Sequence, residues 1–363
     1  MKIIHVADLH LDSKMESNLP IEKARERREE LLETYERMVE YADANRVRVI
    51  LIAGDFFDKK HNRKSVRKRV LEQVRRHPGI DFLYLRGNHD DSDFLIDEKP
   101  SNIPSNLKSF REDEWVSYDY GDVVITGREI SCDNARLLAN NLVLDQARCN
   151  IVTLHGQEME SDGPDRAEII NRSEFRGKNI DYLALGHVHS YKEGRLDDRG
   201  VWAYSGCLEG RGFDECGKKG FVLLDVTDGQ ITSEFIPFAR RTLHEVNVEL
   251  NVEMSMPDVI EAVNENLRSI PSDDLVKIVL NGKIHMDLDL DLGRIRRTFL
   301  DRFYYVKVKD KTSVKIDYES YREDRSLKGE FVRLLEGEDL PEEERALIIE
   351  TGMRAIMGED IEE

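Results

Sequence analysis

Residues 49–58 read Val-Ile-Leu-Ile-Ala-Gly-Asp-Phe-Phe-Asp, and this stretch decides the fold. Its first five residues form an apolar run of the kind that builds a β-strand. The run then closes on a glycine and two aspartates, Asp55 and Asp58. In α/β sheets, ligands gather beyond the carboxyl ends of the strands. The stretch therefore predicts an α/β protein with a functional site that includes Asp55.

Four further stretches repeat this pattern of an apolar, strand-like run that closes on polar residues. They are Asp8-Leu9-His10, Gly87-Asn88-His89-Asp90, Leu154-His155-Gly156 and Gly186-His187-Val188-His189. Polar residues at five strand ends can converge although they are far apart in the sequence. Five of the ten histidines fall inside these motifs, so coincidence is improbable. The side chains offer the nitrogen and oxygen donors that suit Mn, Fe or Zn.

The donors indicate a site for two metal ions. Two divalent cations about 3.5–4 Å apart can clamp the attacking and leaving oxygens of a phosphoryl displacement, and a shared carboxylate is their natural bridge. Asp55 is the best candidate for the bridge, because Gly54 beside it allows close approach. A first ion could take Asp8, His10 and Asp55, and a second could take Asp55, Asn88 and His155. His187 and His189 would share one face of a strand and could serve one ion each.

Two further residues have predicted catalytic roles. His89 follows a predicted ligand, but in an extended turn it should point away from the metal of Asn88. A histidine there can donate a proton to the leaving alkoxide at neutral pH. Asp58 could orient His89, as a carboxylate does in a catalytic triad. Alternatively, Asp58 could be the N-cap of the helix that follows.

The composition favours a multidomain protein without a membrane span. At 363 residues the chain is too long for one average domain, and 40% of it is hydrophobic, enough for sizeable cores. No apolar run approaches the roughly 18 residues of a membrane-spanning helix, and no signal peptide is expected. The four cysteines form no Cys-x-x-Cys pair and indicate reduced thiols. We therefore expect a cytoplasmic protein, associated with the nucleoid in a prokaryote.

The charge of the chain is unevenly distributed. A net charge of −19 argues against simple electrostatic adhesion to nucleic acid or to an anionic membrane. Residues 59–76, however, hold nine Lys or Arg and a single acid, Glu72. One interpretation is the solvated face of a helix, since valines at 66, 70 and 74 form an apolar stripe. The other is a strip that contacts phosphates beside the site, with substrate bound by Lys59, Lys60, Arg63 and Lys64.

Three domains are predicted from changes in the pattern along the chain. Residues 1–238 alternate strand-like and helix-like segments and then become rich in short strands, which fits two stacked sheets covered by helices. Residues 241–312 form a βαβαβ run typical of a small α+β domain. Residues 313–363 hold a polar tether and two apolar helical stripes. This hairpin, at 326–357, is either a docking element for a partner or packs on its own chain.

The ordered motifs resemble those of the calcineurin-like metallophosphoesterases. The set is D-x-H, G-D-x-x-D, G-N-H-D, a lone H-G and G-H-x-H. The fuller strings are similar to one branch, the SbcD-type (meiotic recombination eleven) DNA repair nucleases. Among them are Ile-His-Val-Ala-Asp-Leu-His-Leu-Asp at 4–12 and Tyr-Ser-Gly at 204–206. The resemblance is strong over residues 1–238 and rests on pattern alone in the next domain.

The resemblance implies an αββα metallophosphoesterase sandwich of two sheets, with a small α+β capping domain and a C-terminal helical hairpin. It implies Mn as the metal, with one ion held by Asp8, His10, Asp55 and His189 and the other by Asp55, Asn88, His155 and His187. His89 would assist phosphodiester cleavage without binding metal. The protein would be an exo- or endonuclease of DNA double-strand-break repair. It would form a homodimer, and its hairpin would dock on an SbcC-type coiled-coil ATPase.

Departures from this branch leave other functions open. Position 58 is Asp where many members carry His, and the loop at 206–215 lacks the serine of the usual Gly-Ser-rich substrate loop. A small-substrate or cyclic-nucleotide phosphodiesterase of the same fold is one alternative, and the acidic net charge favours it. A non-catalytic scaffold is the other. Such scaffolds usually lose ligands, whereas every ligand is present here.

Overall fold

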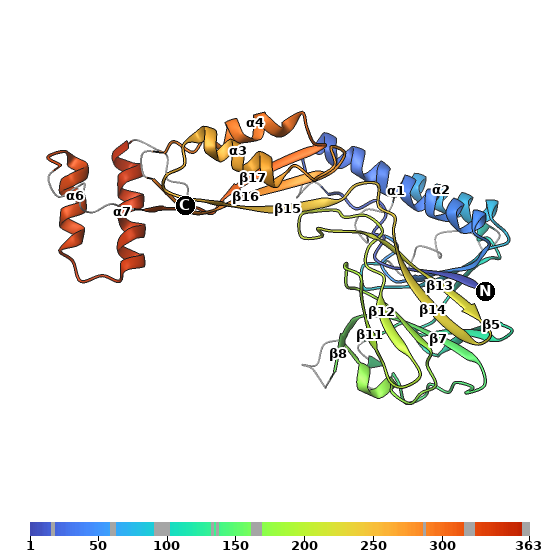
Figure 1. The fold of residues 1–363 in the computed structure, drawn as a ribbon. Coiled ribbons are helices and arrows are strands. Elements are labelled where there is room, and N and C mark those ends of the chain that lie inside the picture. The colour runs from blue at the N-terminus through green and yellow to red at the C-terminus, as the bar shows by residue number, and fades with distance from the viewer. Residues whose placement is uncertain are drawn as a thin grey trace. The chain divides into compact units, whose positions relative to one another are not determined.

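The computed structural model describes the chain except for residues 16–18, 59–62, 91–101, 132–133, 136–137, 161–168, 286–287, 316–323 and 358–363. The described residues form two compact units, Met1–Leu243 and His244–Glu363 (Figure 1). The predicted domains at 241–312 and 313–363 lie almost entirely in the second unit, and the division between them stays a prediction. No helix in the described part of the chain is long and apolar enough to cross a membrane.

The first unit is built on two β-sheets, as predicted. In the first sheet four strands run parallel, and two more extend one edge in antiparallel pairing. Its order is β14 (Gln230–Pro237), β13 (Gly220–Thr227), β1 (Lys2–Val6), β2 (Val47–Ala53), β3 (Asp81–Leu85) and β4 (Leu107–Ser109). The neighbours β1, β2 and β3 precede the first three sequence motifs. Their parallel pairing therefore brings those motifs to the same edge of the sheet.

The second sheet also has a parallel centre. Its order is β11 (Lys192–Arg195), β12 (Val201–Tyr204), β10 (Tyr182–Gly186), β7 (Cys149–His155), β6 (Val123–Gly127) and β5 (Val116–Tyr120). β7 and β10 pair in parallel with Gly186 opposite His155, so the last two motifs are neighbours. A short ribbon of β8 (Gln157–Met159) and β9 (Ile169–Asn171) follows His155.

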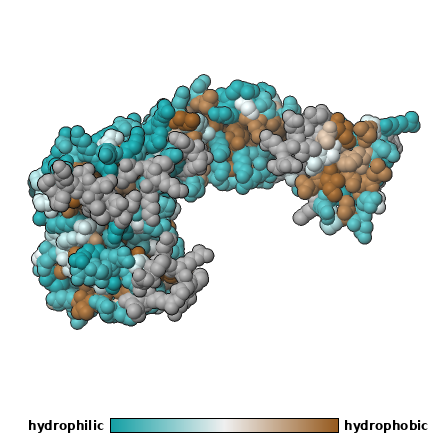
Figure 2. Space-filling model, turned by 180° about the vertical axis from the view of Figure 1, so that it is seen from behind, coloured by the Kyte–Doolittle hydropathy of each residue, from teal (hydrophilic) through white to brown (hydrophobic). Residues whose placement is uncertain are grey.

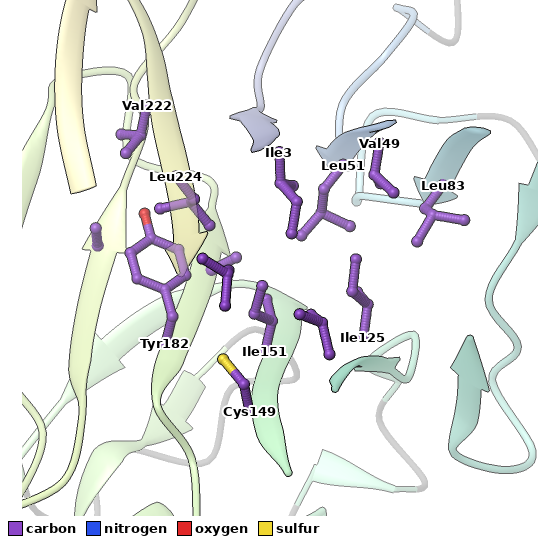
Figure 3. Packing of buried hydrophobic residues seen from close by; sticks show 14 of the residues in the cluster. Ile3, Val49, Leu51, Leu83, Ile125, Cys149, Ile151, Tyr182, Val222 and Leu224 are labelled. Atoms are coloured by element: carbon purple, nitrogen blue, oxygen red, sulfur yellow. The ribbon is translucent and has the colours of Figure 1, made fainter. Parts of the chain in front are cut away.

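The two sheets pack face to face through one apolar core (Figure 3). Ile3, Val49 and Leu51 come from the first sheet, and Ile125 and Ile151 come from the second. All five side chains are fully buried. Burial of an aliphatic side chain of this size stabilises a fold by about 1.5–3 kcal/mol. The core thereby holds both sets of strand ends in place.

The outer faces of the two sheets are covered differently. The helices α1 (Ile21–Ala44) and α2 (Lys64–Arg76) cover the first sheet in Figure 1. On the second sheet, the leucines at 137, 138 and 142 predict a helix over residues 134–142. This prediction is wrong, because the described residues there form turns and one 3-10 position rather than an α-helix. Leu138 and Leu142 nevertheless pack with Phe175 of a short 3-10 helix, η3 (Arg172–Phe175). The apolar spacing indicated burial without a regular helix.

The predicted βαβαβ run is confirmed in the second unit. Its sheet has the order β15 (Leu243–Leu250), β16 (Leu275–His285) and β17 (Tyr305–Asp310), and β18 (Ser313–Lys315) also pairs with β16. The helices α3 (Met256–Asn266) and α4 (Leu292–Leu300) pack on it. Val263 and Ile295 of these helices share a core with Ile278 of β16. Because β18 joins the sheet, the sheet extends into the segment predicted as a tether.

The predicted helical hairpin is also present. It consists of α6 (Leu327–Glu336) and α7 (Glu342–Met357). Its buried core is small, with Val332, Ile349 and Met353 at its centre. Val314 of β18 packs against this core, so the hairpin rests partly on its own unit.

Candidate metal centre

The loops after the strands place predicted ligands on an unusual backbone. Asp8, His10, Asp55 and His187 have positive φ angles of 52°, 42°, 52° and 106°. Residues other than glycine rarely adopt this left-handed region, and such positions cluster at functional sites. Asp8 N donates to the Gly54 carbonyl at 3.0 Å, and His10 N donates to the Asp55 carbonyl at 2.9 Å. These bonds hold the loops after β1 and β2 against each other.

One cluster of donors combines Asp8, His10 and His189. One ligand atom of each lies within 4.8 Å of the other two. The Nε2 atoms of His10 and His189 are 3.4 Å apart, and His189 Nε2 is 3.9 Å from Asp8 Oδ1. Asp8 and His10 are each 1% exposed. This cluster therefore contains three of the four residues predicted around the first ion.

A second cluster combines Asp8, Asp55 and His155, and one ligand atom of each again lies within 4.8 Å of the other two. Asp55 Oδ2 is 3.6 Å from His10 Nε2 and 3.4 Å from His155 Nε2. One carboxylate oxygen thus faces one histidine of each cluster, where a bridging ligand would lie. Asn88 Oδ1 is 3.0 Å from His155 Nε2, which adds the predicted amide ligand to this side.

Two histidines have the hydrogen-bond partners that metal-ligating histidines need. His155 Nδ1 is 2.9 Å from the Ala53 carbonyl, which can only accept. His189 Nδ1 is 2.7 Å from the Glu215 carboxylate. In both rings Nδ1 donates to an oxygen outside the clusters, and Nε2 is the nitrogen that faces the other predicted ligands. The ring of His187 lies edge-on to that of His155, with centroids 5.5 Å apart.

The electrostatics of the clusters favour a bound cation. Burial raises the pKa of the Asp8 carboxyl to about 6, although the charges of His155 and His189 act against this. Burial also acts to raise the pKa of Asp55, but the hydrogen bond and charge of His155 outweigh it and hold that pKa well below its usual range. Two carboxylates are thus buried together at a cost in free energy that a divalent cation would offset. Carboxylate, imidazole and amide donors also suit a metal of the Mn, Fe or Zn type.

Two glycines are required at the strand ends. A Cβ on Gly54 would lie 2.0 Å from His155 Nδ1, and a Cβ on Gly87 would lie 2.3 Å from Asp55 Oδ1. Both distances are far below contact, so any other residue would displace a predicted ligand. The glycines of the second and third motifs therefore serve close approach between the loops.

His89 lies at the rim of the clusters. Its ring is edge-on to that of His10, with centroids 5.1 Å apart, and its side chain is exposed. Its backbone N–H donates to Asp55 Oδ1 at 2.8 Å. In the described part of the chain, no hydrogen bond joins Asp58 to His89. The alternative interpretation of Asp58 is wrong, because the N-cap of α2 is Arg63.

The predicted phosphate strip is only partly open to substrate. Lys59 and Lys60 lie outside the described residues. Arg63 is bound to Asp12, with Nη2 2.6 Å from Oδ1 and its backbone N donating to Oδ2 at 2.8 Å. It therefore ties α2 to the loop of the first motif, a role that the sequence did not indicate. Lys64 is exposed at the start of α2.

Asp90 belongs to a predicted motif but had no predicted role. Its carboxylate accepts backbone hydrogen bonds from Phe56 at 3.3 Å, Phe57 at 2.9 Å and Gly87 at 2.9 Å. It therefore fastens the loop after β2 to the loop after β3. Its place in a Gly-Asn-His-Asp turn was a usable signal, because turn aspartates commonly accept backbone N–H groups.

Glu215 was not predicted either, and it lies outside every motif. It is 4% exposed and contacts both His189 and Arg211. Burial acts to raise the pKa of the Glu215 carboxyl, but the hydrogen bond from His189 and the charge of Arg211 outweigh it and hold that pKa well below its usual range. The carboxylate is therefore a permanent negative charge beside a predicted ligand.

Comparison with known proteins identifies the family. A family described as calcineurin-like phosphoesterase matches residues 1–191. The chain is 28% identical over 304 residues to the uncharacterized metallophosphoesterase YhaO of Bacillus subtilis, which covers 78% of this chain and 72% of that protein. It is 26% identical over 318 residues to the DNA double-strand break repair protein Mre11 of Aeropyrum pernix, at 81% and 75% coverage. The Mre11 of Sulfolobus acidocaldarius is 22% identical over 347 residues, at 88% coverage of both chains.

The family match spans more than half of the 363 residues. It covers the strands and loops that carry all five motifs, and the clustered donors lie where these loops converge. Each line of observation therefore points to the same chemistry. The chain belongs to the calcineurin-like phosphoesterase family and is a metal-dependent phosphoester hydrolase.

Proposed function

We propose that this chain is a DNA nuclease of double-strand-break repair that hydrolyses phosphodiester bonds with two divalent ions, most suitably Mn. The position of Asp55 carries the proposal, because one of its oxygens faces both His10 and His155. When bound, two cations at such a bridge stabilise the attacking and leaving oxygens of the phosphate. Relatives that are named DNA double-strand break repair protein Mre11 match at least three quarters of the chain, which favours DNA as the substrate.

The ligands would divide between the two ions as the resemblance implies. One ion would be held by Asp8, His10, Asp55 and His189, and the other by Asp55, Asn88, His155 and His187. The facing Nε2 atoms of His10 and His189 support the first set. The contact between Asn88 and His155 supports the second.

His89 would act as the proton donor to the leaving oxygen. Its exposed ring beside His10 lies at the edge of the clusters, where a bound phosphodiester can approach. Its backbone N–H donates to Asp55, which fixes the main chain of His89 relative to the proposed bridge. Asp58 remains proposed as a positioning residue that orients His89 during catalysis. The exposed Lys64 remains a proposed phosphate contact, together with Lys59, Lys60 and Arg63.

The test is hydrolysis of two substrates by the same preparation. End-labelled single- and double-stranded DNA and a small chromogenic phosphodiester are each incubated with Mn, and then with chelator. The proposal predicts cleavage of DNA that chelator abolishes and added Mn restores. Hydrolysis of the small diester alone would instead support a small-substrate or cyclic-nucleotide phosphodiesterase.

The hairpin is proposed as the docking site for an SbcC-type coiled-coil ATPase. Figure 2 shows hydrophobic residues gathered on it. Leu327, Leu334 and Leu347 are 70%, 64% and 64% exposed. An amphipathic pair of helices with exposed leucines suits a hydrophobic groove on another protein. The expected homodimer is not tested by a single chain and stays a prediction.

A pair of matched substitutions tests the docking site. The double variant Leu334→Ser/Leu347→Ser changes the hairpin, and Leu300→Ser changes an exposed leucine of α4 outside it. Only the hairpin variant should fail to co-purify with a co-encoded ATPase, while both keep wild-type metal content. Equal co-purification of the two variants would contradict this docking site.

A further inference from the structure

The loop between β12 and β13, residues 205–219, is folded against His189. The His189 carbonyl accepts hydrogen bonds from Cys207 N at 3.3 Å and from Lys219 Nζ at 2.7 Å. The ring Nδ1 of His189 is 2.7 Å from Glu215 Oε1. Lys219 and Glu215 are only 3% and 4% exposed. The loop thus holds both the backbone and the ring of one predicted ligand.

Glu215 is itself fixed by Arg211. Arg211 Nη2 is 2.6 Å from Glu215 Oε1, and the backbone N of Arg211 donates to Oε2 at 2.8 Å. A guanidinium only donates and an ionised carboxylate only accepts. Arg211 Nη2 is also 3.1 Å from His189 Nδ1, but it donates at the shorter distance of 2.6 Å to Glu215 Oε1. The 2.7 Å contact between His189 Nδ1 and the carboxylate, which can only accept, therefore places the proton on Nδ1. The Nε2 lone pair is left for the donor cluster, where His10 Nε2 is 3.4 Å away.

We propose that Glu215, held by Arg211, is the positioning residue for His189. It fixes the tautomer and the orientation of the ring, so that Nε2 is ready to bind metal before the metal arrives. The proposal rests on the proposed metal centre but not on the identity of the substrate. The Nδ1 atom of His155 is bound instead by the backbone carbonyl of Ala53, and no side-chain substitution removes that carbonyl. The ring of His189, by contrast, is held at Nδ1 by another side chain.

The same loop contains a matched control. Glu209 is 1% exposed and binds Arg27 Nη2 and Thr34 Oγ1 of α1, each at 2.8 Å. None of the hydrogen bonds of Glu209 in the described part of the chain reaches His189. Glu209→Gln thus removes the same charge from the same loop without changing the partner of the histidine.

The experiment compares wild type, Glu215→Gln and Glu209→Gln, each checked for folding by circular dichroism. Mn alone is titrated by calorimetry. Mutation of a side chain that hydrogen-bonds a ligating histidine typically weakens metal binding by about 10–100-fold. This is the result expected for Glu215→Gln, because the amide can donate to Nδ1 as well as accept from it and so no longer fixes one tautomer. Glu209→Gln should bind as wild type does. Equal affinity of Glu215→Gln and wild type, or an equal loss in both variants, would overturn the proposal.

A second readout needs no metal. In nitrogen NMR of the metal-free protein, His189 should show the single Nδ1–H tautomer in wild type and in Glu209→Gln. Glu215→Gln should show a mixture, and an unchanged tautomer there would refute the positioning role. If wild type binds no Mn, the proposed function fails, while the tautomer still tests this inference.

A substitute is available if Glu215→Gln does not fold. Arg211→Lys keeps the positive charge but loses the fork that grips Glu215. Weaker Mn binding by this variant would support the proposal, and wild-type binding would overturn it.

Discussion

The two units of the chain bury different kinds of side chain. The first unit buries charged groups such as Asp8, Arg27 and Glu209, whereas Asp274 is the single buried polar or charged residue among those described in the second. Asp274 is paired with His244 at 2.9 Å. Burying a charge is costly unless partners compensate for it. The comparison therefore places the chemistry in the first unit.

The largest effect is expected on DNA cleavage, when the exposed His89 of the first unit is substituted. His89→Gln should keep the metal and lower DNA cleavage by about 10²–10⁴-fold, because general acid catalysis is worth that much. Cleavage rates with saturating Mn, together with metal content, provide the measurement. A parallel loss of metal would show that His89 is a ligand and not a proton donor.

The second-largest effect is expected on the free energy of unfolding, when the same Ile→Ala substitution is made in the core of each unit. Ile151 and Ile349 are both fully buried. Ile151→Ala should lower the free energy of unfolding of the first unit by about 2–5 kcal/mol. Ile349→Ala should leave that unit unchanged, because its hairpin core is small and belongs to the second unit.

Urea unfolding followed by tryptophan fluorescence separates these outcomes. Both tryptophans of the chain, Trp115 and Trp202, lie in the first unit. The tryptophan transition should therefore shift in Ile151→Ala and stay at its wild-type position in Ile349→Ala. Equal shifts would show that the two units unfold as one, and the comparison would lose its basis.

The smallest effect is expected on stability, when the buried carboxylate of Glu30, which lies outside the predicted metal centre, is substituted. Glu30 accepts from Arg27 Nη1 at 2.6 Å and from Arg241 Nη2 at 2.7 Å. Burial acts to raise the pKa of Glu30, but the hydrogen bonds from Arg241 and Arg27 outweigh it and lower that pKa. At pH values above the ordinary glutamate pKa of about 4.3, the ionised form of Glu30 therefore stabilises the folded state. This stabilisation is lost as the pH falls through the lower pKa that Glu30 has in the folded state.

Glu30→Gln should cost about 1–3 kcal/mol at pH 7. The gap between wild type and variant should shrink as the pH falls below about 4. Urea midpoints of both proteins at pH 7 and at acid pH provide the measurement. A gap that does not change with pH would show that the charge of Glu30 contributes nothing.

The elements that could be predicted from the sequence are those set by local pattern. Each apolar run before a motif became a strand, and the run after residue 243 became the predicted small α+β fold. The motifs converge because parallel strands place their carboxyl ends together. Leu138 and Leu142 show the limit of this reasoning, since their spacing predicted a helix but only burial followed.

The contacts that could not be predicted join loops far apart in the chain. Arg63 binds Asp12, and Glu215 binds His189, across 51 and 26 residues. Nothing local distinguishes these acids from the many other acidic residues of the chain. Their partners are fixed only when the strands and α2 have placed the loops, so tertiary structure was needed to find them.

The number of Mn ions that the chain binds tests the central claim most directly. Metal content is measured by mass spectrometry after dialysis against Mn, for wild type and for Asp55→Asn. Wild type should hold about two ions per chain, as a two-metal hydrolase requires. Asp55→Asn should lose both, because one oxygen of Asp55 faces a histidine of each cluster. Full occupancy of the variant, or a wild type without metal, would contradict the account.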